Sequence, residues 1–291
     1  ILSKKIPSLF GGAADLTVSN LTKSKNQKVY NNKNSKGTYL YFGVREHGMV
    51  AAMSGMSLHG GIIPYGGSFL IFTDYCRPSI RLASFMKIKA IYIMTHDSIG
   101  LGEDGPTHQP IEHLASLRSI PNLNVLRPAD AIETLECWET ALNQSAPSVI
   151  SLTRQDIPIV RNKNIFTNLS SQGAYIISET KKSKRDITIL ATGSEVSIAI
   201  ETKNILERKK KMIELSDIFV CLPGGIGTLD EITEVLSTAA LGEHSKPIFL
   251  INTNNFWSPF MSLLSHMEKN KFIRINGDEA IKSSSLSNLF I

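Results

Sequence analysis

The alternation of short apolar runs with helical patterns constrains the fold of this chain more than any other feature. The clearest apolar run, residues 89–96 (KAIYIMTH), has the length of a buried strand and is too short for a helix. Further strands are expected at residues 37–43, 62–69, 123–128 and 147–154, separated by helical patterns at residues 46–59, 70–86, 111–119 and 129–144. Strands that alternate with helices predict βαβ units, and therefore a parallel sheet with helices on its faces.

The second half of the chain repeats this pattern on a smaller scale. A polar stretch with one strand-like run at residues 173–178 precedes this second half. The strands predicted in the second half lie at residues 186–191, 217–222 and 247–253. Helices are expected at residues 194–216, 228–241 and 256–267, the first linking strands 186–191 and 217–222 by a right-handed crossover. We therefore expect a three-layer α/β domain over residues 1–156, a linker over 157–185, a smaller Rossmann-like α/β domain over 186–275, and a tail over 276–291 with a frayed end at 283–288.

Composition narrows the class of protein further. The sequence has no apolar run near the ~20 residues that span a bilayer. Its three cysteines, Cys76, Cys137 and Cys221, have no metal-site spacing, which favours a reducing, cytoplasmic location. The net charge of +5 comes from lysine-rich runs without interleaved aromatic residues, so neither nucleic acid nor a membrane is expected as a partner. A basic balance suits phosphorylated small substrates.

Polar residues follow the predicted strands at the edge where parallel sheets bind ligands. Glu46 follows the first strand, His96 follows the strand at residues 89–96, and Arg127 and Arg154 end the next two. Each has an ordinary structural alternative: Glu46 suits a helix N-terminus, His96 a structural hydrogen bond, and an arginine a surface ion pair. The aromatic residues at helical spacing nearby are equally compatible with a core; they are Phe69, Phe72 and Tyr75. Their coincidence at one edge nevertheless predicts a binding site.

Six sequence strings in the first half resemble transketolase. They are GGAADLTVSN (11–20), YFGVREHGM (41–49), PYGGSF (64–69), THDSIGLGEDGPTHQP (95–110), LRPAD (126–130) and SLTRQ (151–155). The resemblance runs almost without gaps to residue 154. The string DITILATGSEV (186–196) resembles the start of that family's C-terminal domain and extends the likeness to residue 204. The resemblance implies the pyrimidine-binding domain of a thiamine-diphosphate enzyme.

The resemblance also implies residue roles. Glu46 would hydrogen-bond a ring nitrogen of the aminopyrimidine and stabilise the imino form that deprotonates the thiazolium carbon. Phe69, Phe72 and Tyr75 would pack around the pyrimidine, and Asp15 would support the cofactor across a dimer interface. The residues at the sugar phosphate would be His96 and Asp104 at its hydroxyls, Arg154 and Ser19 at its phosphate, and His108 beside the site.

Half of the family's cofactor site has no counterpart in this sequence. The family binds the diphosphate and its Mg²⁺ or Ca²⁺ through a separate N-terminal domain, whereas this sequence has no Gly-Asp-Gly followed at a distance by an Asn for that purpose. We therefore expect this chain to hold only the pyrimidine part of thiamine diphosphate, with no metal ligand of its own for it. A homodimer partner or a separate diphosphate-binding subunit would complete the site.

A second resemblance begins at about residue 205 and extends to residue 273. The strings ERKKKM (207–212) and LPGGIGTLDE (222–231) resemble the LONELY GUY, or lysine-decarboxylase-like, phosphoribohydrolases of nucleoside monophosphates. A strand that enters a glycine-rich turn before a helix presents free N–H groups suited to phosphate, although such a turn can also be purely structural. The resemblance implies Arg208 and Glu231 as a catalytic pair and a phosphate loop of Pro223, Gly224, Gly225, Gly227 and Thr228. The family's N-terminal nucleotide loop has no counterpart here, and Leu206 stands where a histidine often precedes the Arg-Lys pair.

Three functions remain open from the sequence. The first is transfer of a two-carbon ketol unit between sugar phosphates, which the extent of the first resemblance favours. The second is hydrolysis of a nucleoside monophosphate to its base and ribose 5-phosphate. The third is a non-catalytic fusion remnant that binds a sugar phosphate or a partner subunit.

Overall fold

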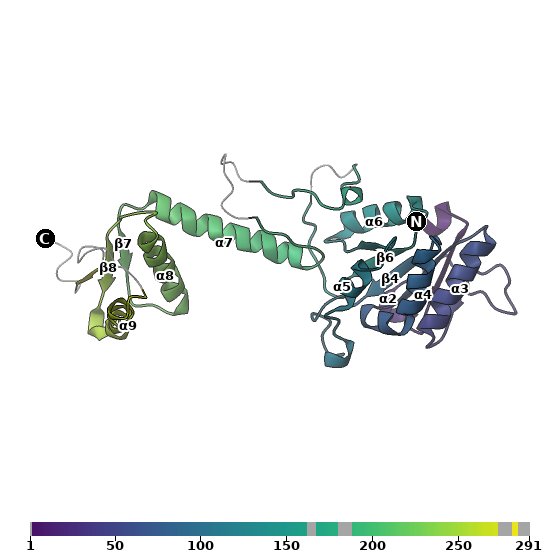
Figure 1. Ribbon diagram of the computed structural model, residues 1–291, viewed down its shortest axis with the longest axis horizontal. Helices are drawn as coiled ribbons and strands as arrows, with labels where there is room; N and C mark the ends of the chain where they lie inside the picture. The colour runs from purple at the N-terminus through teal and green to yellow at the C-terminus, as the bar shows by residue number, and fades with distance from the viewer. Residues whose placement is uncertain (1, 162–166, 180–187, 273–280, 285–291) are drawn as a thin grey trace. The chain divides into compact units, whose positions relative to one another are not determined.

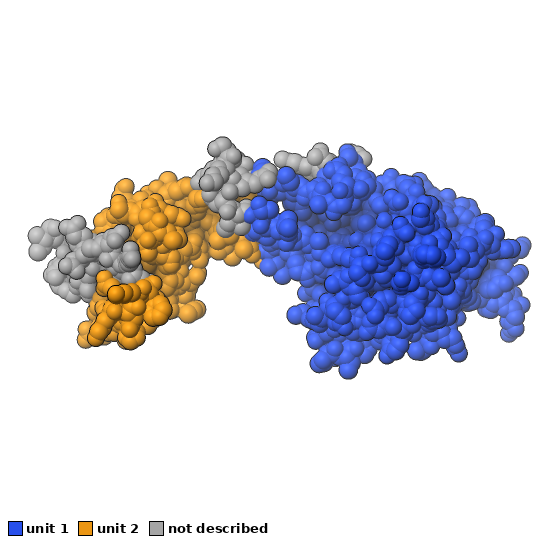
Figure 2. Space-filling view, in the orientation of Figure 1, with its two compact units in different colours: residues 1–200 blue, residues 201–291 orange. Residues whose placement is uncertain are grey.

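The computed structural model describes residues 2–161, 167–179, 188–272 and 281–284. The chain divides into two compact units, residues 1–200 and residues 201–291, shown in different colours in Figure 2. Each unit contains a parallel sheet with helices packed on it, so the expected α/β class is confirmed. None of the described helices is both long and apolar enough to cross a bilayer.

The first unit contains a six-stranded sheet in which every neighbouring pair is parallel. In spatial order its strands are β2 (Tyr39–Tyr41), β1 (Leu9–Ala13), β3 (Ile63–Phe69), β4 (Ile91–Thr95), β6 (Ser148–Leu152) and β5 (Asn124–Leu126). The five strands expected from the sequence are present. Strand β1 was not expected, because its sequence LFGGA carries too few bulky residues for a strand signal. Its glycines are required by packing: a Cβ on Gly11 would lie 2.3 Å from the Tyr65 ring.

Helices cover both faces of this sheet (Figure 1). The helices are α1 (Leu2–Lys5), α2 (Thr17–Asn20), α3 (Glu46–His59), α4 (Thr73–Phe85), α5 (His113–Arg118) and α6 (Ala131–Asn143). Alternate residues of β4 enter different cores. Tyr92 and Met94 pack with apolar residues of α3, α4 and α5, whereas Ile91 and Ile93 pack with residues of α1 and α6. Strand β4 is buried along its whole length, which explains its continuous apolar sequence.

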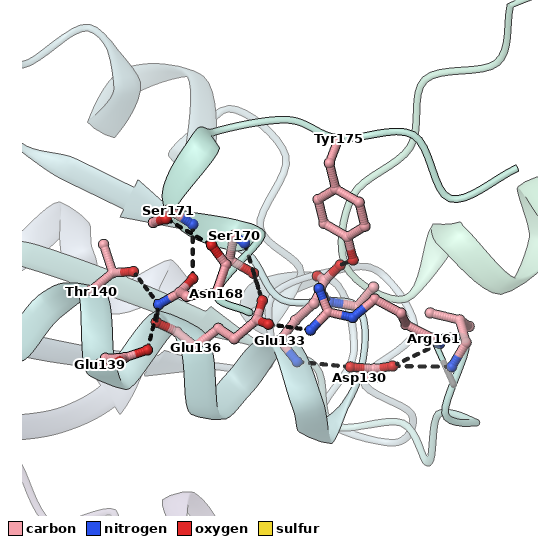
Figure 3. Close-up of polar contacts among 12 residues, drawn as sticks. Asp130, Glu133, Glu136, Glu139, Thr140, Arg161, Asn168, Ser170, Ser171 and Tyr175 are labelled. Carbon is pink, nitrogen blue, oxygen red and sulfur yellow. Dashed lines mark hydrogen bonds and ion pairs between the residues drawn. The ribbon is translucent and has the colours of Figure 1, made fainter. Parts of the chain in front are cut away.

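The chain that follows β6 is held against α6 by acidic side chains of that helix (Figure 3). Asp130, at the N-cap of α6, accepts hydrogen bonds from the backbone N–H of Glu133 (2.8 Å) and Val160 (3.0 Å). Glu136 forms a buried ion pair with Arg161 and accepts the Ser170 hydroxyl at 2.8 Å. Tyr175 donates to Glu133. We call these contacts the α6 clamp, and because of them residues 173–178 do not form the strand that their sequence suggested.

The long helix expected over residues 194–216 is present as α7 (Glu195–Leu215), and the boundary between the two units falls inside it. The strand expected at residues 186–191 is absent from residues 188–191, and residues 186–187 lie outside the described chain. Arg127 explains why the segment before α7 is not available for sheet pairing in the second unit. Its guanidinium donates to the Thr192 carbonyl at 2.9 Å and pairs with Glu195, which ties this segment to the first unit.

The second unit contains the parallel strands β7 (Phe219–Cys221), β8 (Ile248–Ile251) and β9 (Ile281–Ser284), in that spatial order. Strand β7 pairs with β8 and not with residues 188–191, so the expected crossover is wrong. Residues 283–284, expected to be frayed, belong to β9 instead; residues 285–288 lie outside the described chain. Helices α8 (Ile226–Ala240) and α9 (Ser258–Lys269) pack on the sheet around Ile232, Leu250 and Trp257.

The α6 clamp should be a main source of stability for the first unit. Glu136→Ala should lower the free energy of unfolding by about 3 kcal/mol, because it leaves the buried Arg161 guanidinium without its carboxylate. Urea unfolding of the full chain, followed by the fluorescence of Trp138 in a Trp257→Phe background, measures this. The control Glu139→Ala removes an exposed carboxylate of the same helix and should cost less than about 1 kcal/mol.

The same pair gives the clamp a pH dependence. Burial alone would raise the pKa of Glu136, but hydrogen bonds from Arg161 and Ser170 outweigh burial and hold the pKa below its ordinary value. The contribution of Glu136 is therefore complete above that ordinary value and is lost as the pH falls through the lowered pKa of the folded state. Two results would contradict the role of the α6 clamp. The first is an equal loss of stability in Glu136→Ala and Glu139→Ala, and the second is a loss in Glu136→Ala that does not change with pH in this acidic range.

Candidate functional site

Four neighbouring strands of the large sheet end at one edge, and the predicted site residues follow those ends. Asp15 comes two residues after β1, Phe69 is the last residue of β3, His96 directly follows β4, and Arg154 comes two residues after β6. Because Phe69 aligns with Thr95 and Thr95 aligns with Leu152, the ends of β3, β4 and β6 lie side by side. His96 and Asp15 both adopt positive φ angles, 59° and 63°, where the chain turns away from the sheet.

Aromatic rings form a cluster at this edge of the sheet. The Phe69 ring stacks on the His96 imidazole at a centroid distance of 3.8 Å and on Phe72 at 5.7 Å. His108 meets the edge of Phe72 at 5.4 Å, and Tyr75 lies 6.0 Å from Phe72. Phe69 is buried while Tyr75 is 65% exposed, so the cluster runs from the core to the surface. The structure thus brings together the three aromatic residues and the two histidines predicted from the sequence.

The surroundings of His96 lower the pKa of its imidazole. Burial is the main cause that lowers its pKa, and the positive charge of Arg154 and the neighbouring His108 lower it further, against the opposing effect of Asp104. These electrostatic contributions also place the exposed side chains of Asp104 and Arg154 near the ring. The loop after β4 and the end of β6 therefore bring charged side chains within electrostatic range of His96.

A buried hydrogen-bond chain fixes the tautomer of this histidine. The Thr95 hydroxyl donates to the Asn20 side-chain oxygen at 2.7 Å, and it lies 2.9 Å from His96 Nδ1. Since the single hydroxyl proton is engaged with Asn20, Nδ1–H donates to Thr95 and Nε2 keeps its lone pair. Neither Asn20 nor Thr95 was singled out from the sequence. Both lie inside the transketolase-like sequence strings quoted above. The signal that could have indicated Thr95 was a polar residue directly before His96.

Glu46 begins α3; the residue is 8% exposed, and its carboxylate has no hydrogen-bond partner among the described residues. Its position next to α4 is shown by its charge, which together with burial raises the pKa of the Cys76 thiol to about 12. Cys76 in turn lies one helical turn from Phe72, with its sulfur 3.7 Å from the Phe72 carbonyl oxygen. Glu46 therefore stands beside the helix that carries Phe72 and Tyr75, free to accept a hydrogen bond from a ligand.

The remaining predicted residues of the first unit are less closely joined to this cluster. Ser19 and Asp15 are exposed on the connection between β1 and α2, which is tied to β4 by the hydrogen bond from Thr95 to Asn20. Arg127, expected at the site edge, is engaged elsewhere. Its Nε donates to Asp97 at 2.7 Å while its Nη1 donates to Thr192 and pairs with Glu195, so it ties the chain next to His96 to the start of α7.

In the second unit, the glycine-rich loop joins β7 to the N-terminus of α8, as its sequence predicted. A Cβ on Gly224 would lie 2.2 Å from the Thr228 hydroxyl, so this turn requires glycine. Arg208 on α7 and Glu231 on α8 form an ion pair at 3.4 Å, with side chains 62% and 43% exposed. Beside the loop lies a depression of about 350 Å³, and its lining is mainly apolar: Gly224, Gly225, Ile226, Leu229, Phe256, Trp257, Pro259 and Phe260.

Two family models match the chain. The model described as "Transketolase, pyrimidine binding domain" covers residues 2–160, and the model described as "Possible lysine decarboxylase" covers residues 168–287. Among curated proteins, the chain is 57% identical over 201 residues to a transketolase of Sinorhizobium medicae and 48% identical over 207 residues to one of Geobacillus stearothermophilus. These alignments cover 69% and 70% of this chain but 29% and 31% of those proteins, so the chain spans about a third of the relatives it matches.

Solved structures agree with the sequence matches. A transketolase from Campylobacter jejuni superposes with a TM-score of 0.63 at 40% identity, covering 72% of this chain and 32% of that one. A chain described as "Split gene transketolase, inactive beta4 tetramer" superposes with a TM-score of 0.55 at 25% identity, covering 86% of this chain and 83% of its own length. Because the pyrimidine-binding model matches more than half of its residues, this chain belongs to the transketolase pyrimidine-binding domain family.

Proposed function

We propose that this chain supplies the pyrimidine half of a thiamine-diphosphate site for ketol transfer between sugar phosphates, and that another chain supplies the diphosphate half. The observation that carries the proposal is the Phe69–Phe72–Tyr75 cluster, together with Glu46, a mostly buried residue beside α4 that has no hydrogen-bond partner among the described residues. An aminopyrimidine has a flat apolar ring and polar ring nitrogens, which this combination of groups matches.

Each group would perform a simple task in that site. The aromatic rings bind and orient the pyrimidine, while Glu46 accepts a hydrogen bond from a ring nitrogen and holds a proton there. Exclusion of water around Glu46 strengthens this interaction. The cofactor, when bound, supplies the carbanion chemistry that no protein side chain can provide.

The residues around His96 would bind the sugar phosphate. Nε2 of the neutral His96 accepts a hydrogen bond from a sugar hydroxyl, and Asp104 accepts another. Arg154, with its permanent positive charge, suits a phosphate group, and Ser19 on the β1–α2 connection would add a donor.

The likeness to a split-gene transketolase supports the assignment to two chains. The split-gene chain superposes on 86% of this chain at 25% identity. We infer that the diphosphate and its Mg²⁺ or Ca²⁺ are held by a separate subunit or by the matching domain of a dimer partner, with Asp15 supporting the cofactor at the interface. Three free cysteines suit a reducing compartment such as the cytoplasm.

Reconstitution tests this proposal. The purified chain, mixed with a transketolase diphosphate-binding domain, thiamine diphosphate and Mg²⁺, should transfer a ketol unit from a ketose phosphate to an aldose phosphate. Glu46→Ala should lower the rate at least about 100-fold because the proton at the ring nitrogen is no longer held. The change should leave the far-ultraviolet circular dichroism spectrum intact, and Glu139→Ala on α6 is the matched control with full activity expected.

Two results would separate the alternatives. Equal activity of Glu46→Ala and Glu139→Ala would exclude the role given to Glu46. Complete inactivity of every mixture, with sugar phosphate binding intact, would favour the non-catalytic remnant.

A second candidate function rests on the ion pair between Arg208 and Glu231 beside the glycine-rich loop. Both side chains are substantially exposed, and the sequence has no counterpart of the family's first nucleotide loop. Orientation of the bound substrate contributes about 7–11 kcal/mol at best to such catalysis. We therefore propose that phosphoribohydrolase activity is weak or absent.

This expectation is checked by incubating the chain with AMP and measuring free adenine by chromatography. The wild-type chain and Glu231→Ala should both release adenine at the buffer rate. Release that is fast in the wild type and falls on Glu231→Ala would make the nucleotide-hydrolase function the better assignment.

A further inference from the structure

A cluster of metal-binding side chain types lies outside the aromatic site, where α4 approaches α5. Asp74 is in the first turn of α4, Glu112 is the N-cap residue of α5, and His113 is the first residue of α5. Asp74 Oδ2 is 3.2 Å from His113 Nε2, and Glu112 Oε2 is 3.9 Å from His113 Nδ1. One nitrogen of the histidine and one oxygen of each carboxylate all lie within 4.8 Å of one another.

The histidine of this cluster is buried without hydrogen bonds. The His113 side chain is 2% exposed, and neither ring nitrogen has a partner in hydrogen-bond geometry among the described residues. A buried polar group left in this state costs about 1–3 kcal/mol, which a ligand bound to the ring would recover. The two carboxylates are 55% and 74% exposed, so an ion from solvent can reach them beside the buried ring.

We propose that Asp74, Glu112 and His113 bind one divalent transition-metal ion, for which Zn²⁺ is the natural probe. Imidazole nitrogen and carboxylate oxygen together are a ligand set of Zn²⁺, with bond lengths near 2.0–2.2 Å. Ligand atoms of one ion lie about 3–3.5 Å apart at such bond lengths. The distance of 3.2 Å from Asp74 to His113 Nε2 is in this range, whereas Glu112 lies 3.9 Å from Nδ1 and would have to turn toward an ion bound at Nε2. Water would occupy the remaining coordination position, because both carboxylates face solvent.

The bound ion would restrain the loop after β4 that carries Asp104 and His108. Asp74 directly precedes Tyr75 of the aromatic cluster, while Glu112 and His113 follow the loop that carries Asp104 and His108. A metal that joins these positions would restrain the end of the loop against α4. This ion is distinct from the diphosphate-bound metal of the proposed function, and its binding does not depend on that function.

The test is a Zn²⁺ titration of the full chain after treatment with EDTA and removal of the chelator. Isothermal titration calorimetry should show one site per chain in the wild type. Asp74→Asn and Glu112→Gln change exposed side chains and preserve the fold, and each should weaken Zn²⁺ binding more than about tenfold, since loss of even an outer-shell partner costs about 10–100-fold. His59→Gln and Glu139→Gln, which alter an exposed histidine and an exposed carboxylate, are the matched controls and should bind as the wild type does.

Long-range ¹H–¹⁵N spectra of the histidine rings identify the ligand directly. One His113 ring nitrogen, assigned by comparison with His113→Gln, should shift on addition of one equivalent of Zn²⁺. The proposal is overturned if the wild type binds no more Zn²⁺ than the Asp74→Asn/Glu112→Gln double variant, or if the His113 signals stay unchanged. A His113 ring protonated on both nitrogens and indifferent to Zn²⁺ would show that the cluster is an ion pair only.

Discussion

The parallel alignment of β1, β3, β4 and β6 is the constraint on which the site depends. Strand β4 lies in the middle of this group, and its alternate side chains enter the two cores on opposite faces of the sheet. A strand fixed on both faces cannot slip by one residue without moving apolar groups to the wrong side. The residue that follows it, His96, is therefore placed accurately next to the last residue of β3, Phe69, on which it stacks.

Two different kinds of polar interaction build on this sheet edge. At the candidate site, Glu46 has no hydrogen-bond partner among the described residues, and burial lowers the pKa of His96. Away from it, charges are paired: Arg127 joins Asp97 to the start of α7, and Glu136 joins Arg161 to α6. Paired charges fix the chain around the site, and unpaired groups remain where a ligand can satisfy them.

Sequence patterns were most informative where one physical signal dominated. The buried run of β4 and the helix that begins at Glu46 were predicted because apolar burial and strong helix formers leave few alternatives. Strand β1 escaped prediction because its glycines are selected by contact with Tyr65, which is distant in sequence. Residues 188–191 were expected to form a strand, and the long-range contacts of Arg127 with the segment before α7 could not be foreseen. The exposure of the site residues on the loop after β4 likewise depends on the course of that loop. Such contacts have no local signature.

The central claim is that this chain forms only the pyrimidine half of a cofactor site, and titration with thiamine diphosphate tests it most directly. Calorimetry should show weak binding to the chain alone that Mg²⁺ does not improve, because in this account the residues around Glu46 would contact only the pyrimidine. Addition of a transketolase diphosphate-binding domain should produce tight binding that requires Mg²⁺ and both chains. Tight, Mg²⁺-dependent binding of thiamine diphosphate by the chain alone would contradict the half-site account.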